Sequence, residues 1–439
     1  MTVLLLLVAV FTVLAAYNVY RPRFAPGRWA VVSFFAGWLV GELALHFVAL
    51  QALFVAGLYV YGKVQGTWAW LALFGLVGSW LALLKAYANA HQAHQVVELA
   101  LHETFGPDYR QQVPPPLRER WAEQVNWKKI WLPFPIRDPE VVCTADIVYR
   151  RATGLNLRLD VYRRRDRPAR CPVLVQIHGG GWVIGSKNEQ GLPLMYEMAR
   201  QGWVCASVDY RLSPHATFPD HLVDVKAALV WLRQHAEQYG IDPNFVVVTG
   251  GSAGGHLAAL VALTPNEPAY QPGFEAADTA VQGAVLMYGV YDLVDRFRTF
   301  RNPDIHHLLE TKVFKASLEE APELYERASP IALVGPQAPP MCIVHGNLDS
   351  LVPVEQARHF VSALRAVSRQ PVVYAEIPGA QHAFDLFPSL RCQHVIHGIA
   401  RFLSVIYSAY LVQRQAEERP AGSAQAEGHE GQRASSRGG

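Results

Sequence analysis

The sequence predicts an α/β fold in which a mainly parallel sheet lies between two helical layers, with apolar helices preceding it. Three observations lead to this prediction. Short apolar runs alternate with longer helical patterns between residues 146 and 410. Glycine clusters directly follow two of these runs, at 179–181 and 250–255. The first 88 residues are almost free of charge, which is typical of membrane-spanning helices.

The composition excludes some classes of function. A chain of 439 residues, 51% hydrophobic and 17% charged, can form more than one domain and is more apolar than an average soluble protein. Its 39 basic and 37 acidic residues nearly cancel, so we expect no nucleic-acid partner. The five cysteines are scattered along the chain and form no C-x-x-C pair. We therefore expect neither a zinc site nor a redox motif.

Three apolar stretches predict a transmembrane helical region over residues 1–88, with about three spans and with two or four left open. They cover residues 3–20, 29–61 and 67–87. A span needs about 20 residues, so the middle stretch is too long for one upright helix and short for two. Arginines at 21, 23 and 28 place the first loop inside by the positive-inside rule. Three spans then leave the rest of a multi-pass protein on the cytoplasmic side, which we favour, whereas four would place it outside.

Glu42 and His46 are the ionisable interruptions of the middle stretch. They are four residues apart and therefore share one helix face. Ionisable groups in a membrane segment are functional candidates. An interhelical hydrogen bond that holds the bundle together is the interpretation that we favour.

A connector, which could also form a lid, is expected over residues 89–145. His94, Glu98 and His102 recur every four residues and could hold a metal, but no further ligands lie nearby. A solvated helix leaving the membrane is the favoured interpretation. Tryptophans beside lysines then suit a membrane interface, and a lid over the active site is the alternative. These residues are Trp121, Trp127, Lys128, Lys129 and Trp131.

Eight short runs predict the strands of the sheet, and the first two predict a hairpin because Gly154 lies between them. The runs are 147–151, 156–163, 172–177, 203–208, 245–249, 284–287, 341–345 and 372–377. Helical patterns follow at 218–239, 354–367 and 389–407, after an earlier one that ends at Arg200. Strands that alternate with helices in this way predict a mainly parallel sheet.

Ser252 lies in a Gly-x-Ser-x-Gly pattern between an apolar run and a small-residue helix. Such a strand–turn–helix lifts the serine hydroxyl clear of the sheet, and its flanking glycines avoid a steric clash. Gly179, Gly180 and Gly181 follow another strand and can bring backbone N–H groups to a developing negative charge. Losing one such donor typically costs about 10²–10³ in rate. The two signals together predict nucleophilic attack on a carbonyl group.

An acid and a base follow the serine in the expected order, each after a strand. His382 can take the serine proton, and Asp349 can orient the imidazole ring. Several other groups are weaker candidates because motifs already occupy their positions or because they lie poorly placed along the chain. The alternative bases are His178, His256 and His345, and the alternative acids are Glu355 and Asp385.

Residues from about 146 to 405 resemble α/β-hydrolases of the esterase/lipase group that is related to hormone-sensitive lipase and bacterial carboxylesterases. The matching motifs are His178-Gly179-Gly180-Gly181-Trp182, Val208-Asp209-Tyr210-Arg211-Leu212, Gly250-Gly251-Ser252-Ala253-Gly254-Gly255, His345-Gly346-Asn347-Leu348-Asp349 and His382-Ala383-Phe384. The resemblance implies the α/β-hydrolase fold and a catalytic triad of Ser252, Asp349 and His382. It also implies an oxyanion hole in which the Ala253 N–H joins donors among the three glycines, of which the donating pair stays open.

Gly251 departs from the pattern of many of these esterases, which have aspartate before the serine. A glycine at this position resembles the pattern of prenylcysteine-methylesterase-like and arylformamidase-like enzymes, so the motif defines the substrate class less narrowly. Asp209 and Arg211 are expected to be structural supports near the glycine loop. Residues 292–336 are expected to form a cap insert that shapes the pocket, and residues 411–439 a disordered tail because they contain few large apolar side chains.

The expected protein is a membrane-anchored serine hydrolase that cleaves lipidic or amphipathic carboxylic esters. The proposed chemistry needs neither a metal nor an organic cofactor. An amidase, peptidase or arylformamidase-like hydrolase of the same fold is an alternative. A catalytically silent hydrolase-fold module that only binds its ligand is another.

Overall fold

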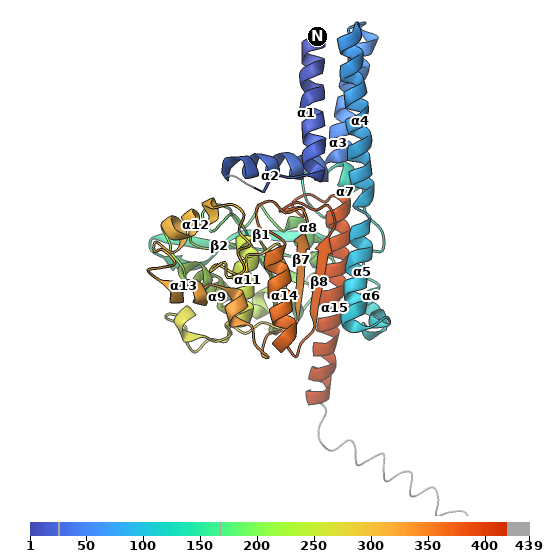
Figure 1. Ribbon diagram of the computed structural model, residues 1–439. Helices are drawn as coiled ribbons and strands as arrows, with labels where there is room; N and C mark the ends of the chain where they lie inside the picture. The colour runs from blue at the N-terminus through green and yellow to red at the C-terminus, as the bar shows by residue number, and fades with distance from the viewer. Residues whose placement is uncertain (25–26, 167, 419–439) are drawn as a thin grey trace, which may run out of the picture.

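A single eight-stranded sheet organises the computed structural model, which describes residues 1–24, 27–166 and 168–418. The strand order is β1-β2-β4-β3-β5-β6-β7-β8. The first two strands form an antiparallel hairpin and β2 pairs antiparallel with β4, while all other neighbours are parallel. Helices cover both faces, and an upright group of N-terminal helices rises from one end of the sheet (Figure 1).

All eight predicted strands are present, and the predicted hairpin is confirmed. The strands are β1 (Val141–Ala152), β2 (Leu155–Arg164), β3 (Cys171–Ile177), β4 (Val204–Val208), β5 (Ile241–Gly251), β6 (Gly283–Met287), β7 (Met341–Gly346) and β8 (Val372–Ile377). The central strands β3, β4, β6 and β7 are buried along their whole length, as parallel strands covered on both faces must be.

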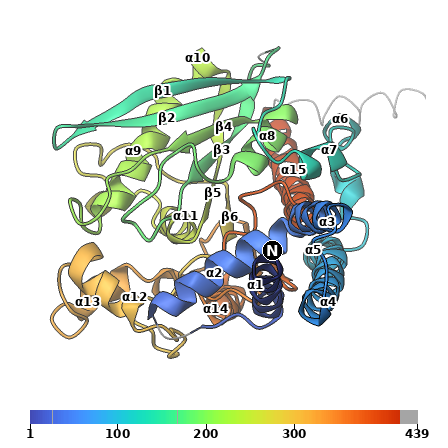
Figure 2. The same ribbon diagram turned by 90° about the horizontal axis from the view of Figure 1, so that it is seen from above.

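Two helical layers enclose the sheet and confirm the predicted three-layer architecture (Figure 2). One layer consists of α9 (Asp220–Gln234), α11 (Ala253–Leu263) and α14 (Glu355–Val367), and the other of α5 (Gln92–Phe105), α8 (Leu192–Arg200) and α15 (Leu390–Glu418). Shorter helices are α6 (Pro115–Arg118), α7 (Trp127–Trp131), α10 (Ala236–Tyr239), α12 (Asp304–Leu308) and α13 (Pro322–Arg327). Single helical turns lie at Tyr109–Gln112, Pro268–Tyr270, Leu309–Val313 and Pro330–Leu333.

Helix α15 is longer than the sequence predicts. It continues to Glu418, although the helix was expected to end at residue 407 and a disordered tail to begin at 411. The final turns consist largely of good helix formers, and Arg414 Nη1 lies 3.1 Å from Asp242 Oδ2 at the start of β5. The predicted tail is therefore wrong for 411–418, and its remainder lies outside the described residues.

Helix α5 belongs to a layer of the sheet, whereas its residues were expected to form part of a connector. Ala93, Val97 and Leu101 are buried in the same cluster as residues of α15 and β8. Gly398 of α15 allows this contact, because a Cβ atom there would lie 2.0 Å from Val97 Cγ1. The expected solvated helix is thus covered on one side by the α/β body.

The N-terminal helices contain α1 (Thr2–Tyr20), α3 (Ala44–Val60) and α4 (Thr67–Asn89), which stand upright, and α2 (Gly27–Glu42), which lies across the body (Figure 1). The middle apolar stretch is broken by a bend of 82° between α2 and α3. Three described helices are long and apolar enough to cross a membrane, or four if the bent pair counts as one span. One of the three is α15, whose apolar window is 72% buried inside the body.

Polar bonds between the upright helices come from Gln51 and from Tyr20, whose hydroxyl donates to the carbonyl oxygen of Ala82 at 2.7 Å, rather than from Glu42 and His46. The Gln51 amide donates to Thr12 Oγ1 at 2.9 Å, and Trp80 Nε1 donates to Gln51 Oε1 at 2.7 Å. Glu42 instead forms a buried ion pair with Arg391, and His46 Nε2 donates to the carbonyl oxygen of Trp131 at 3.1 Å. The expectation that Glu42 and His46 hold the bundle together is wrong, because both attach it to the rest of the chain.

Candidate active site

Ser252 sits at a strained turn between β5 and α11. Its backbone has φ 58° and ψ −124°, a left-handed conformation that is costly for a residue with a side chain. The turn is tight because a Cβ atom on Gly254 would lie 2.1 Å from the carbonyl oxygen of Ile177. The Ser252 N–H donates to the carbonyl oxygen of Met287 at 3.0 Å, which ties the turn to β6.

His382 and Asp349 meet on the loops that follow β8 and β7. His382 Nδ1 lies 2.6 Å from Asp349 Oδ2. The other carboxylate oxygen accepts backbone N–H bonds from Leu351 at 2.9 Å and Val352 at 2.8 Å. These bonds fix the carboxylate, and an imidazole that donates from Nδ1 presents Nε2 as a base.

Asp349 is kept ionised although it is fully buried. Burial raises the pKa of its carboxyl, but the charge of His382 and hydrogen bonds from His345 and His382 outweigh burial and lower the pKa to about 2. His345 Nε2 lies 3.3 Å from Asp349 Oδ2 and 2.9 Å from the carbonyl oxygen of Val352. The alternative base His345 therefore supports the carboxylate and does not face the serine.

The other alternative bases have structural partners. The His178 ring stacks on Tyr210 with centroids 4.3 Å apart. His256 Nδ1 accepts from Trp182 Nε1 at 3.2 Å, and its Nε2 donates to the carbonyl oxygen of Ala328 at 2.7 Å. Burial lowers the pKa of His256 to about 4, so the ring stays neutral.

The alternative acids and the two expected supports are also engaged elsewhere. Asp385 accepts a hydrogen bond from the Tyr288 hydroxyl, and Glu355 pairs with Arg301 at 2.9 Å. Asp209 Oδ1 accepts the Lys187 N–H at 2.9 Å. Arg211 Nε lies 2.7 Å from Asp224 Oδ2.

The glycine loop lies directly against the serine turn. A Cβ atom on Gly179 would lie 2.7 Å from the carbonyl oxygen of Gly251 and 3.1 Å from Ser252 Cβ. The Gly179 N–H donates to Gln190 Oε1 at 2.7 Å. Within the described ranges, the N–H groups of Gly180 and Gly181 take part in no hydrogen bond. Sequence reasoning missed Gln190, because nothing near it marks its role.

A cavity of about 240 Å³ joins these groups. Ser252, Ala253, Gly181 and His382 line it, together with the segment expected to form a cap. That segment contributes Phe300, Arg301, Asn302, Asp304, Ile305 and Leu308. Phe24 from the N-terminal region lines the same cavity, and the Arg301 guanidinium lies 4.6 Å from its ring centroid.

Helix α2 covers the loop that carries His382. The Phe34 ring meets the His382 ring edge-on with centroids 6.0 Å apart. Trp38 Nε1 donates to the carbonyl oxygen of Ala383 at 2.9 Å, and its ring stacks on Phe387 at 4.9 Å. The hydrophobic sequence of α2 predicts a membrane segment and carries no local signal for this contact.

Gly251 is explained by Tyr288. A Cβ atom at position 251 would lie 2.5 Å from the Tyr288 hydroxyl oxygen. Tyr288 is buried, its ring lies 4.6 Å from the His382 ring, and its hydroxyl donates to Asp385. The space beside the serine is therefore filled by the tyrosine that directly follows β6, where many related esterases place an aspartate.

The connector does not form a lid on this cavity. None of the described residues between 89 and 145 lines it, and several of them line a second cavity instead. Glu98, a candidate metal ligand, is engaged by Arg110 at 2.9 Å and by Arg401. The described part of the chain contains no cluster of three or more His, Cys, Asp or Glu residues that could hold a metal ion.

Comparisons with known proteins identify the family of the chain. The family model described as BD-FAE matches residues 159–364. The chain is 41% identical to the probable carboxylic ester hydrolase LipM of Mycobacterium tuberculosis, over 92% of this chain and 93% of that protein. The chain belongs to the α/β-hydrolase esterase/lipase family. It is a carboxylic ester hydrolase, as its likeness to the esterase LipQ of the same organism also indicates, at 39% identity over 87% of this chain and 86% of that one.

A solved structure supports the fold. A truncated carbohydrate esterase from gut microbiota superposes with a TM-score of 0.53, covering 61% of this chain and 96% of its own. Its sequence is 22% identical, so the likeness concerns the α/β-hydrolase fold alone.

Replacing Gly251 by alanine tests the tyrosine contact. The new methyl group would overlap the Tyr288 hydroxyl, and we expect a loss of about 1–3 kcal/mol in the free energy of unfolding together with reduced esterase activity. Urea unfolding followed by tryptophan fluorescence measures the first effect. Gly335→Ala is the matched control, because no atom lies within 4 Å of its added Cβ. Equal stability of the two variants would contradict the crowding argument.

The lowered pKa of Asp349 predicts a stability change in acid. The carboxyl titrates near 3.8 in the unfolded chain and near 2 in the folded one, so its contribution is complete above about pH 4. It is lost as the pH falls from about 4 to about 2, and amounts to about 2 kcal/mol. Unfolding free energies across this range should decrease less steeply for Asp349→Asn than for wild type. Equal slopes of unfolding free energy against pH for the two proteins would show that folding does not lower the pKa of the Asp349 carboxyl.

Proposed function

We propose that Ser252, His382 and Asp349 form the catalytic triad of a membrane-anchored serine hydrolase that cleaves lipidic or amphipathic carboxylic esters. One observation carries the proposal. A serine at a strained elbow lines the same cavity as a histidine whose Nδ1 lies 2.6 Å from a buried carboxylate. Strained backbone at such a point is characteristic of sites where a nucleophile must be exposed.

The triad residues divide the chemistry in two steps. Ser252 Oγ attacks the ester carbonyl while His382 Nε2 takes its proton, and Asp349 stabilises the imidazolium that forms. His382 then gives the proton to the leaving alcohol, which leaves an acyl group on Ser252. Water attacks this acyl-enzyme with the same histidine as base. The bond between the acyl carbon and Ser252 Oγ then breaks, the carboxylic acid is released, and His382 returns the proton to Oγ.

The negative oxygen of the tetrahedral intermediate needs backbone donors. The Gly179 N–H donates a hydrogen bond to Gln190 Oε1, whereas the N–H groups of Gly180 and Gly181 donate to no described residue. Ala253 begins α11, so its N–H has no intrahelical partner. We therefore assign the oxyanion hole to Gly180, Gly181 and Ala253. Gly179 then has a packing role against Ser252.

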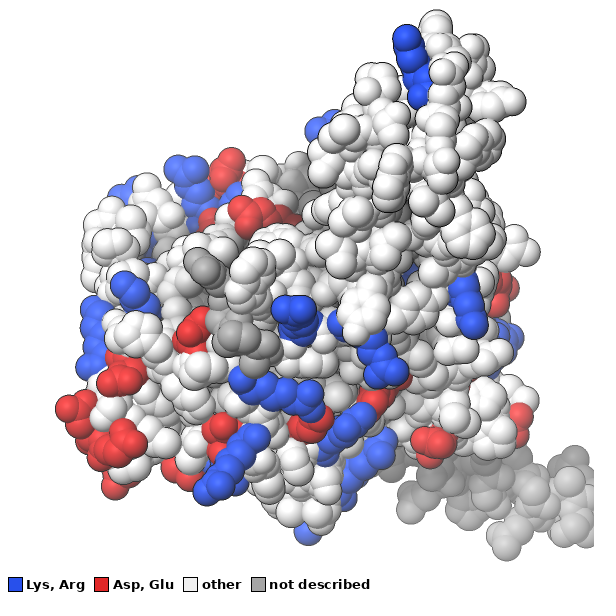
Figure 3. Space-filling view, turned by 45° about the horizontal axis from the view of Figure 1, so that its top comes forward, with Lys and Arg blue, Asp and Glu red and all other residues white. Residues whose placement is uncertain are grey.

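The upright helices support membrane anchoring. Their outer side chains are apolar and exposed, as Leu7, Leu53 and Phe74 show with exposed fractions of 63%, 72% and 81%. Figure 3 shows that the projecting part is almost free of charged side chains, while charges of both signs cover the body. The 19 residues of α1 span about 28 Å, close to the hydrocarbon thickness of about 30 Å. So large an apolar surface would not be stable in water.

The distribution of basic residues supports a cytoplasmic catalytic domain. Arg21 and Arg23 follow α1 on the side of the α/β body, whereas the first residue of the chain lies at the far end of the bundle (Figure 1). The loop between α3 and α4, at the other end of these helices, carries the single basic residue Lys63. The positive-inside rule then places the arginine loop, and with it the body, on the cytoplasmic side of a three-span anchor.

The cavity favours a substrate of which only the reacting part is enclosed. Its volume of about 240 Å³ is below the roughly 300–1,000 Å³ of pockets that enclose drug-sized ligands. Phe24, which lines it, directly follows Arg23 in the loop that we place at the membrane surface. An ester whose apolar remainder stays in the bilayer would fit the small cavity and would reach it from the membrane surface.

Activity-based labelling tests the nucleophile and the topology together. A fluorophosphonate probe should label the wild-type chain and fail to label Ser252→Ala, while Asp349→Asn should reduce kcat for a simple ester by roughly 10³–10⁴-fold because the imidazole loses its orienting partner. A membrane-impermeant form of the probe should label only permeabilised cells. Labelling of Ser252→Ala would exclude this nucleophile, and labelling of intact cells would place the domain outside.

The substrate class is tested by direct competition. Purified full-length protein should hydrolyse acylglycerols in mixed micelles with a kcat/KM at least equal to that for short, water-soluble esters. Matching anilides should react far more slowly, which separates an esterase from an amidase of the same fold. Rapid turnover of the short esters with no reaction of acylglycerols would exclude a lipidic substrate.

A further inference from the structure

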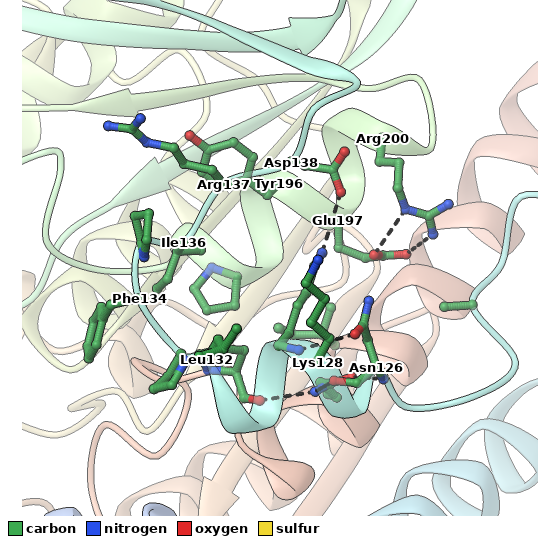
Figure 4. Close-up of a pocket in the computed structure, with 18 of the residues that line it drawn as sticks. Asn126, Lys128, Leu132, Phe134, Ile136, Arg137, Asp138, Tyr196, Glu197 and Arg200 are labelled. Atoms are coloured by element: carbon green, nitrogen blue, oxygen red, sulfur yellow. Dashed lines mark hydrogen bonds and ion pairs between the residues drawn. The ribbon is translucent and has the colours of Figure 1, made fainter.

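A second and larger cavity, of about 610 Å³, lies between the connector and helices α8 and α15 (Figure 4). It includes none of the residues that line the Ser252 cavity. The connector supplies one wall, with Lys128, Leu132 and Phe134 among its side chains. Tyr196 and Arg200 of α8 form the opposite wall.

The mouth of this cavity has an excess of positive charge. Lys129 Nζ pairs with Asp138 at 3.4 Å, and Arg200 pairs with Glu197 at 2.6 Å. Lys128 and Arg137 also line the cavity and, within the part of the chain that the structure describes, have no ion-pair partner. Two uncompensated cations at an opening favour an anionic ligand.

The floor of the cavity holds a polar group without a hydrogen-bond partner. His397 of α15 is 9% exposed and lines the cavity, and no described residue bonds to either of its ring nitrogens. Burial lowers the pKa of His397 to about 4, so a neutral ring offers one donor and one acceptor. A buried imidazole in this state can bind a hydroxyl group of a ligand.

The rim of the cavity is apolar and continues to the proposed membrane surface. Leu132 and Phe134 are 63% and 61% exposed, and neighbouring Trp131 accepts a bond from His46 of α3 through its carbonyl oxygen. Phe134 also meets Phe387 edge-on at 5.5 Å, and Phe387 stacks on Trp38 of α2. The opening therefore lies where the upright helices join the body.

We propose that this cavity binds the head group of an acidic glycerophospholipid whose acyl chains remain in the bilayer beside Leu132 and Phe134. Lys128 and Arg137 bind the phosphate, and His397 bonds to a hydroxyl group of the head. The inference rests on the proposed membrane anchoring but does not need the esterase mechanism. A bound lipid here would hold the connector, and with it the body, against the membrane.

Lipid binding by full-length Ser252→Ala protein in detergent tests the proposal, since this variant cannot degrade the ester probes. Fluorescence anisotropy of chain-labelled phosphatidylglycerol should show tighter binding than that of chain-labelled phosphatidylcholine. The added change Lys128→Gln/Arg137→Gln should weaken phosphatidylglycerol binding by roughly tenfold or more. Equal affinity for the two lipids, or an unchanged affinity after the double substitution, would overturn the proposal.

The matched control is Arg151→Gln/Arg369→Gln, which removes the same charge from exposed positions that do not line the cavity. It should leave phosphatidylglycerol binding unchanged, and an equal loss would reveal a nonspecific charge effect and overturn the site. Soluble glycerol 1-phosphate should displace the lipid poorly, because a free anion lacks the apolar contacts. Displacement of the lipid by glycerol 1-phosphate at equal concentration would show that the cavity binds soluble anions, and would overturn the lipid proposal.

Two readouts separate this inference from the proposed function. Lys128→Gln/Arg137→Gln in a chain with Ser252 intact should keep fluorophosphonate labelling, which shows that the variant is folded. Loss of lipid binding with labelling retained is the result that we expect. Should Ser252 never label while phosphatidylglycerol still binds through Lys128 and Arg137, the catalytic proposal fails and the lipid site stands.

Discussion

Backbone-to-backbone contact at the carboxyl edge of β3 and β5 is the constraint on which the site depends. Gly254 approaches Ile177 so closely that a Cβ atom would lie 2.1 Å from its carbonyl oxygen, and Gly179 approaches the carbonyl oxygen of Gly251 in the same way. Without side chains between them, the serine turn and the glycine loop lie in direct contact. This contact holds Ser252 in its strained conformation and brings N–H groups from both segments to one cavity.

The candidate acid and base, Asp349 and His382, are placed by a second set of contacts between β7, β8 and the loops that follow them. Gly346 at the end of β7 pairs in register with Ile377 at the end of β8, so the two following loops start side by side. Gln381 Oε1 accepts N–H bonds from Ser350 at 2.7 Å and from His382 at 2.8 Å, which joins these loops. The short contact between His382 and Asp349 is therefore a result of parallel register and one amide side chain.

Local patterns predicted the strands and the candidate triad because each of these features is encoded within a few residues. Contacts across long stretches of chain could not be predicted in this way. Trp38 and Ala383 are 345 residues apart, and nothing in an apolar helix shows which loop it will cover. Gly251 was visible as a departure from related esterases, but its cause, the Tyr288 side chain, lies just after another strand. The extra turns of α15 were missed because Asp242, the stabilising partner of Arg414, is 172 residues away in the chain.

Helix α2 is attached too firmly to act as a freely moving lid. Glu42 at its end forms an ion pair with Arg391 and accepts the Ser389 hydroxyl at 2.6 Å, and both carboxylate contacts are buried. Moving α2 away would leave these charges unpaired, and breaking a buried pair typically costs about 3–5 kcal/mol. A helix held in this way forms a fixed wall beside His382. Differences in substrate must then be accommodated by other parts of the cavity lining, which include Phe24 and the segment around α12.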